Sequence, residues 1–263
     1  MKVLWIAGNT FRENIRDKVL YNLVTVAFLL VGGALLLGEL SIGYEMKIII
    51  DIGMASVSLT GVLIAVFIGI SLVQKEIEKR TIYNIVSKPV SRHQFLLGKF
   101  LGLLFTLAVN VSLMVMAIFA ALIYLNGRWD WSFLNILPAT LLIFMELVLV
   151  TALSLFFSSF STPVLSAVFT LSLWVAGHFN NDFLSFAKLS KSPVAEFTCR
   201  LLYYLLPNFS NFDSNAAPTA IQQAGYLQTP EPVVLLAAFA YGSLYTVLLL
   251  AAAAGIFERR DFK

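Results

Sequence analysis

Charged residues are scarce in this sequence. Lys, Arg, Asp and Glu make up 13% of the 263 residues, while 59% are hydrophobic and the mean hydropathy is +0.85. Soluble domains carry about 25% charged residues, so the composition excludes an ordinary soluble domain. The net charge of +3 is small and dispersed, which argues against nucleic-acid binding. We therefore expect an all-α polytopic membrane protein, because helices satisfy their backbone hydrogen bonds within the hydrocarbon.

Residues that perform catalysis or bind metals are also few. The single cysteine, Cys199, excludes an internal disulfide and a thiolate metal cluster. The two histidines, His93 and His178, are predicted to lie on opposite sides of the membrane, which argues against a metal site. No Gly-Lys pair is followed by Ser or Thr, so the chain lacks a phosphate-binding loop. We expect no catalytic residue, no metal and no cofactor bound by this chain itself.

Long runs without charge predict six transmembrane helices within one domain, residues 1–263. A run of 20 residues makes about 30 Å of helix, which matches the hydrocarbon thickness. The predicted spans are residues 19–38, 52–73, 100–125, 136–158, 164–179 and 233–257. The fifth span is barely long enough to cross, and the short uncharged turn before it predicts a tight hairpin with the fourth.

Two further segments have the spacing of amphipathic helices that lie at the membrane surface. The N-terminal helix is predicted to present an apolar face made of Leu4, Phe11 and Ile15. Within the long segment 180–232, residues 193–206 are apolar and begin with a Ser192-Pro193 cap. This second helix is predicted to be interfacial or re-entrant and to end at Pro207. Its apolar face is formed by Phe197, Leu201, Tyr204 and Leu205.

The distribution of Lys and Arg predicts the orientation in the membrane. Six spans place both termini on the side that also carries segment 74–99, and these three regions hold 13 of the 18 basic residues. The other side holds 5. Basic loops stay on the cytoplasmic side. Both termini and segment 74–99 are therefore predicted to be cytoplasmic, and segment 180–232 external.

The charged segment Gln74–Lys99, between the second and third spans, has the most complete local pattern. One helical face is predicted for Ile82, Ile85 and Val86. Pro89 ends this helix, and Ser91 with Gln94 forms a capping box that starts another. We predict two short helices joined by a rigid elbow. The alternative is a solvated basic loop near anionic headgroups, as in any polytopic membrane protein.

This pattern resembles the loop after the second span of ABC-2 type ABC transporter permeases, especially the six-span branch with the permease of the nitrous-oxide-reductase maturation transporter. In that family the loop is the coupling helix that docks into an ATPase subunit. The matching residues are Glu76, Arg80, Thr81, Ser87, Lys88, Pro89, Val90, Ser91, Arg92, Gly98 and Lys99.

The resemblance implies a permease without its own nucleotide site, located in the bacterial inner (plasma) membrane. Its implied partners are two copies of an ABC ATPase subunit, which would bind ATP and Mg, and a second permease copy or a homologous permease. The near absence of charge in the spans favours a hydrophobic or amphipathic cargo. The alternative function is a non-transporting component that transmits ATPase-driven change or assembles a complex. An ATP-independent carrier is disfavoured, because it would need several intramembrane charges.

Glu146 is the ionisable residue that lies well inside a predicted span, near the middle of the fourth. A carboxylic acid at that depth costs a few kcal/mol unless it faces protein or water, so we expect it to face other helices. It is a candidate substrate or gating contact. The alternative is a packing acid, protonated or hydrogen-bonded to hydroxyl groups such as that of Thr151.

Overall fold

The computed structural model describes residues 2–41, 43–78, 92–189, 193–212 and 232–259, which form helices and turns and contain no strand. In chain order the elements are α1 (Lys2–Ile15), α2 (Lys18–Glu39), α3 (Glu45–Glu78), α5 (Arg92–Asn126), η1 (Trp131–Asn135), α6 (Ile136–Ser158), α7 (Pro163–His178), α8 (Asn180–Leu189), α9 (Pro193–Leu205), η2 (Phe209–Phe212) and α10 (Pro232–Arg259). By length and composition α2, α3, α5, α6 with η1, and α10 can each cross a membrane, and α7 is a shorter apolar helix. The all-α prediction is confirmed, and a sixth crossing by α7 stays a prediction.

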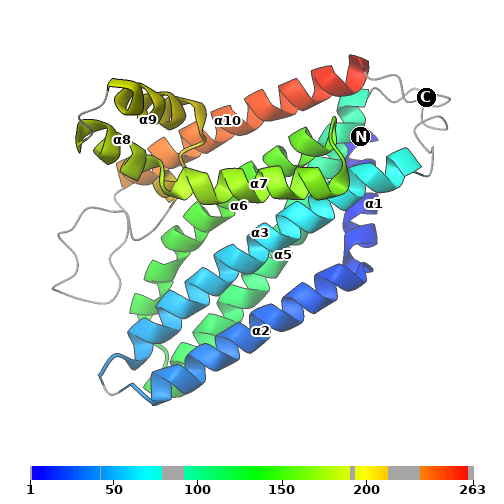
Figure 1. Cartoon of the computed structure of the whole chain (residues 1–263). Helices are drawn as coiled ribbons and strands as arrows, with labels where there is room; N and C mark the ends of the chain where they lie inside the picture. Colours follow the sequence, from blue (N-terminus) through cyan, green and yellow to red (C-terminus); the bar gives the residue numbers. More distant parts are fainter. Residues whose placement is uncertain (1, 42, 79–91, 190–192, 213–231, 260–263) are drawn as a thin grey trace.

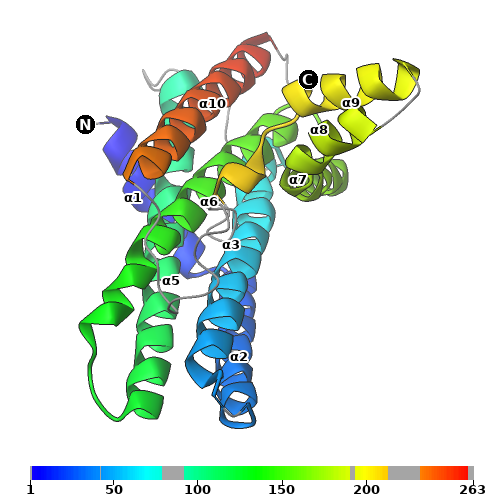
Figure 2. The ribbon, with the colours of Figure 1, turned by 90° about the vertical axis from the view of Figure 1, so that its left-hand side faces the viewer.

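Helix α6 forms the centre of the bundle. It packs against α3, α5, α7 and α10, while α2 packs mainly on α3 (Figures 1 and 2). Every residue of α6 from Glu146 to Leu155 is buried. A helix that is apolar on all sides is stable in this position because each of its faces meets another helix.

Two helices continue beyond the predicted spans, and the positions at which they enter the membrane stay a prediction. Helix α3 begins at Glu45, not residue 52, and continues to Glu78, while α5 begins at Arg92, not residue 100. The second short helix predicted after Ser91 is therefore the first part of α5, because no proline interrupts residues 92–126. The end of the bundle where α3 stops and α5 starts is called the loop end below.

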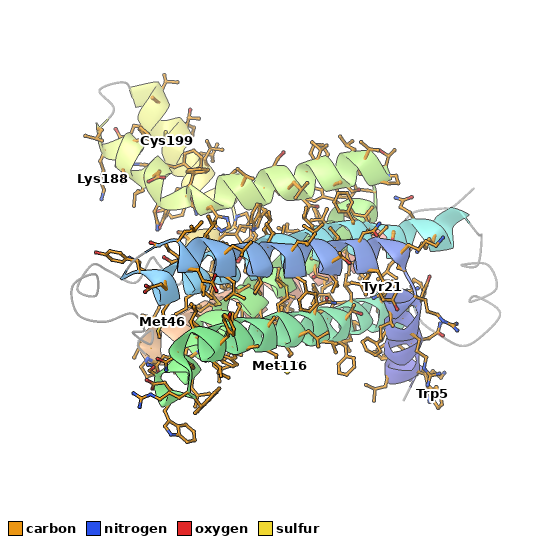
Figure 3. All side chains as sticks on the ribbon, turned by 90° about the horizontal axis from the view of Figure 1, so that it is seen from below. Trp5, Tyr21, Met46, Met116, Lys188 and Cys199 are labelled. Carbon is orange, nitrogen blue, oxygen red and sulfur yellow. The ribbon has the colours of Figure 1, made fainter. Side chains whose placement is uncertain are left out.

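Helix α1 runs across the loop end, at a steep angle to the spanning helices (Figures 1 and 3). Its packed face differs from the predicted apolar face. Thr10 and Asn14 are buried, whereas Leu4 is 71% exposed and Ile15 38% exposed. Phe11 packs edge-on against Phe105 of α5, with ring centroids 4.6 Å apart. The exposed apolar residues are suited to contact lipid, and the predicted position at the membrane surface stays a prediction.

The chain after α6 folds back twice before α10. The predicted tight connection is observed, since α6 ends at Ser158 and α7 begins at Pro163. Helix α9 agrees with the predicted helix at 193–206, but α8 was missed because its apolar residues are interspersed with Asn, Asp, Ser and Lys. Next, η2 returns to the bundle and buries Phe209 and Phe212.

Candidate functional site

Two ion pairs connect the loop end to the N-terminal region. Lys75 Nζ, near the end of α3, lies 2.8 Å from Asp17 Oδ2 in the turn between α1 and α2. Lys99 Nζ, in the second turn of α5, lies 3.4 Å from Glu13 Oε2 of α1. Residues on both sides of segment 79–91 are therefore held to the N-terminal region, one to α1 and one to the turn after it.

The surroundings of these ion pairs keep Asp17 charged and bury the side chain of Lys99. Burial alone would raise the pKa of Asp17, but the hydrogen bonds from Lys75 Nζ and Val19 N–H, together with the Lys75 charge, leave that pKa below its usual value. The side chain of Lys99 is 4% exposed, and its ammonium lies 5.6 Å from the centroid of the Phe95 ring. The aromatic face and the carboxylate together stabilise this buried cation.

Helices α1 and α5 approach each other so closely that two glycines are required at the contact. A Cβ atom on Gly102 would stand 2.7 Å from the Ala7 carbonyl oxygen and 2.6 Å from Thr10 Cβ. A Cβ atom on Gly98 would stand 2.6 Å from Ile6 Cγ2. One turn further along α5, Asn14 Nδ2 donates a hydrogen bond of 3.0 Å to Thr106 Oγ1. The contact therefore combines close backbone approach with a buried polar pair.

A second polar cluster lies inside the bundle, around Glu146. The residue is 3% exposed, so it faces other helices and not lipid. Trp174 Nε1 of α7 donates to Glu146 Oε1 at 2.6 Å, and Ser58 Oγ of α3 donates to Oε2 at 3.2 Å. His178 Nε2, also from α7, lies 3.5 Å from Oε1. The proposed partner Thr151 is wrong, because its hydroxyl donates to the Leu147 carbonyl within α6.

Sequence reasoning did not bring His178 and Glu146 together. From the sequence, His178 was predicted to lie on the other side of the membrane from His93, and Glu146 near the middle of the fourth span. Because α7 has only 16 residues, its last turn reaches only as far as the middle of α6. The signal that could have revealed the pairing is the hairpin itself, since the short turn fixes how far α7 extends beside α6.

The comparison with protein families decides the identity of the chain. The sequence model described as ABC-2 family transporter protein matches residues 4–262. The chain belongs to this family. A search among curated proteins found no match. ABC-2 family proteins are membrane components that work with ATPase subunits. The more specific resemblance to the nitrous-oxide-reductase branch stays a prediction.

Most of the predicted coupling residues of this ABC-2 family protein lie outside the described residues. These are Arg80, Thr81, Ser87, Lys88, Pro89, Val90 and Ser91. Glu76 lies in the last turns of α3 and Arg92 is the first residue of α5, so the structure places both at the edges of the segment. The acidic partners Glu13 and Asp17 were not predicted, because nothing in the sequence places the N-terminal region beside the ends of α3 and α5.

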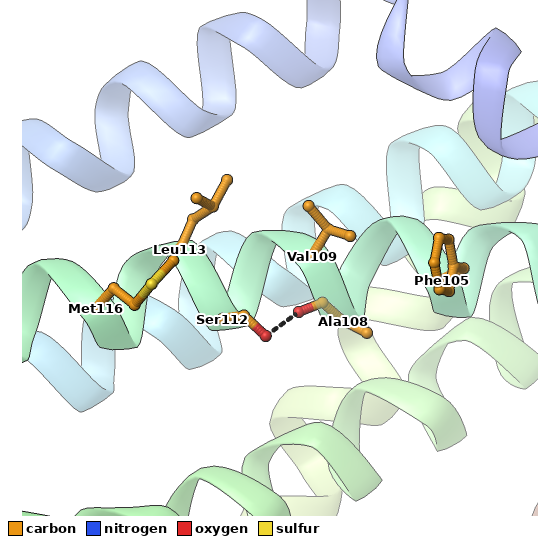
Figure 4. Close-up of a pocket in the computed structure, with 6 residues that line it drawn as sticks. All are labelled: Phe105, Ala108, Val109, Ser112, Leu113 and Met116. Carbon is orange, nitrogen blue, oxygen red and sulfur yellow. Dashed lines mark hydrogen bonds between the residues drawn. The ribbon is translucent and has the colours of Figure 1, made fainter.

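The outer surface of α5 in this ABC-2 family protein carries an apolar groove (Figure 4). Its lining residues all come from α5: Phe105, Ala108, Val109, Ser112, Leu113 and Met116. The Ser112 hydroxyl donates to the Ala108 carbonyl at 2.7 Å, so the serine is already satisfied within the helix. Among the described residues, no three His, Cys, Asp or Glu side chains are grouped to hold a metal ion.

Proposed function

We propose that this protein is the transmembrane permease subunit of an ATP-binding cassette exporter, driven by a separate ATPase that docks at Gln74–Lys99. The observation that carries the proposal is the whole-chain match to the ABC-2 family, together with two ion pairs that bracket segment 79–91. In this proposal ATP and Mg are bound by the partner. The protein pairs with a second copy or a homologous permease in the bacterial inner membrane, with both termini cytoplasmic.

Helices α3 and α5 would transmit a displacement of segment 79–91 from the loop end into the bundle. Helices α3 and α5 continue without a break for 34 and 35 residues. Each extends about 50 Å at 1.5 Å per residue, so its end and its membrane part move together. The contacts of Glu13 and Asp17 extend that displacement to α1 and the start of α2. A flexible connection would absorb the motion instead.

A hydrophobic or amphipathic cargo is favoured because the core formed by α3 and α6 is mainly apolar. Its buried polar side chains are hydroxyl groups and, among the described residues, the one acid Glu146. The alternative function is a non-transporting component that transmits ATPase-driven change or assembles a complex. A transport assay distinguishes the two, since only the exporter moves cargo across the membrane in an ATP-dependent way.

Loosening the predicted elbow is expected to weaken ATPase binding more than removing one charge. The double variant Pro89→Gly/Ser91→Ala should lose the rigid turn and about 1 kcal/mol of helix capping. Glu76→Ala removes an ion pair worth about 1 kcal/mol or less at a partly exposed interface. The measurement is co-purification with the ATPase, followed by ATP-driven transport. Wild-type behaviour of the double variant in both assays would show that the segment is a solvated linker.

Reporter fusions test the predicted orientation. A reporter after Lys263 or near Lys88 should be cytoplasmic, and one near Gln222 should be external, because 13 basic residues lie on one side and 5 on the other. The measurement is labelling of single reporter sites in intact cells and in inverted vesicles. Labelling of the Gln222 site from the cytoplasmic side would contradict a six-span arrangement.

A further inference from the structure

The hydrogen bonds of His178 fix the position of one of its protons. Its Nδ1 lies 2.9 Å from the Trp174 carbonyl oxygen. A carbonyl oxygen only accepts hydrogen bonds, so Nδ1 must carry the hydrogen in this contact. In a neutral imidazole the other nitrogen, Nε2, then has a lone pair and no hydrogen.

The neighbour of Nε2 is the carboxyl group of Glu146. Nε2 of His178 lies 3.5 Å from Glu146 Oε1, and an ionised carboxylate oxygen also only accepts. A neutral imidazole facing a carboxylate would place two lone pairs against each other, at a site where the Glu146 side chain is 4% exposed and the His178 side chain 32%. One proton between the two groups removes this repulsion, either as imidazolium with carboxylate or as imidazole with carboxylic acid. We propose that the buried Glu146 and the partly buried His178 form a proton-binding site that holds the last turn of α7 against α6.

The surroundings show what this proton would hold in place. Trp174 and Ser58 donate to the carboxylate from α7 and α3. On its other side the His178 ring stacks on Phe209 of η2, with centroids 5.8 Å apart and planes inclined by 7°. The neighbouring Gly177 lets η2 approach, since a Cβ there would collide with Phe209 and with the Pro207 carbonyl. Loss of the proton therefore weakens a junction of α6, α7 and η2.

The elements that pack around this junction carry other titratable groups, which differ from an imidazole in the pH range over which they titrate. They include Glu45, Lys47, Asp51 and Lys75 on α3, Asp182 and Lys188 on α8, and Tyr241 and Tyr245 on α10. Carboxylic acids, phenols and amines ordinarily titrate near pH 4, 10 and 10.4, whereas imidazoles titrate near 6.5. The protonation of His178 can be followed through the NMR signals of its own ring nitrogens. A change in these signals with pH is therefore attributable to the proposed pair. The site does not depend on the proposed transport function.

The first test uses nitrogen NMR of the purified full chain in detergent micelles, with ¹⁵N-labelled histidine, between pH 5 and 10. His93→Gln assigns the two rings, since the chain contains two histidines. We expect His178 to keep its Nδ1 hydrogen while Nε2 loses its own with rising pH. In Glu146→Gln the pH at which Nε2 loses its hydrogen should change, because the amide can neither carry the shared proton nor pair with a charged ring. The His93 transition should not move. An unprotonated Nδ1 in the neutral ring, or an unchanged transition in Glu146→Gln, would overturn the proposal.

The second test needs no substitution at the pair. Amide hydrogen exchange of the wild-type chain is measured on both sides of the His178 transition and corrected for the intrinsic pH dependence of exchange. We expect amides 174–179 to lose at least tenfold protection above the transition, while amides in the middle of α3 keep theirs. Equal protection of residues 174–179 on both sides would show that the proton does not hold α7. In His178→Gln the pH dependence of this protection should disappear.

Discussion

Glu146→Leu is expected to lower the free energy of unfolding by several kcal/mol, the largest effect of any single change at the buried cluster. The substitution removes the acceptor of Trp174 Nε1 and Ser58 Oγ and the partner of His178. Each buried polar group left without a partner costs about 1–3 kcal/mol. Glu146→Gln should retain the fold, because the amide oxygen still accepts a hydrogen bond and the volume is conserved.

Thermal unfolding in detergent micelles, followed by tryptophan fluorescence, measures this difference. Thr151→Val is the matched control on the same helix, since the buried Thr151 hydroxyl bonds only within α6 to the Leu147 carbonyl, at 2.7 Å. Equal unfolding temperatures for Glu146→Leu and Glu146→Gln would show that the cluster does not stabilise the fold.

A transport assay distinguishes the two candidate roles of Glu146, which are a substrate or gating contact and a packing acid. Unchanged transport and ATP hydrolysis in Glu146→Gln would leave only the packing role.

Adding two methyl groups between α1 and α5 is expected to displace α1. In Gly98→Ala/Gly102→Ala the new Cβ atoms would meet Ile6, Thr10 and the Ala7 carbonyl at distances of 2.6–2.7 Å. Overpacking of this kind costs about 1–3 kcal/mol per site, and here backbone must move to relieve it. The Asn14–Thr106 hydrogen bond and the Lys99–Glu13 ion pair should be lost with it.

The displacement is measured by thermal unfolding and by hydrogen exchange of α1. Gly32→Ala is the matched control, because a Cβ there has no neighbour within 4 Å and alanine is the better helix former by up to about 1 kcal/mol. The control should be neutral or slightly stabilising. If the double variant unfolds at the temperature of the control and α1 keeps its protection, the close contact does not position α1. If α1 transmits ATPase motion as proposed, ATP-driven transport should fall in the double variant and not in the control.

The sequence by itself determined the class of protein and the positions of its apolar helices. Residues 19–38, 136–158 and 233–257 each agree with a helix to within two residues at either end. Runs without charge specify such helices because an isolated backbone in hydrocarbon has no other way to satisfy its hydrogen bonds. The boundaries at Glu45 and Arg92 were missed for the same reason, since the apolar run marks the membrane part and not the end of the helix. The coupling segment was also predicted from sequence, and the described structure reaches only its two edges.

Only the tertiary structure decided which helix faces meet. The candidate spans have nearly equal mean hydropathy, 2.2–2.4. Yet 72% of the residues are buried in the apolar 18-residue windows of α3 and of α6 with η1, against 22% in those of α2 and α10. Lipid and protein interior are equally apolar, so hydropathy cannot distinguish a packed face from a lipid-facing one. Contacts of small residues decide it, such as Gly61 of α3, where a Cβ would overlap Leu147 of α6. The pairing of Glu146 with His178, and of α1 with α5, follows from how those contacts set the depth and rotation of each helix.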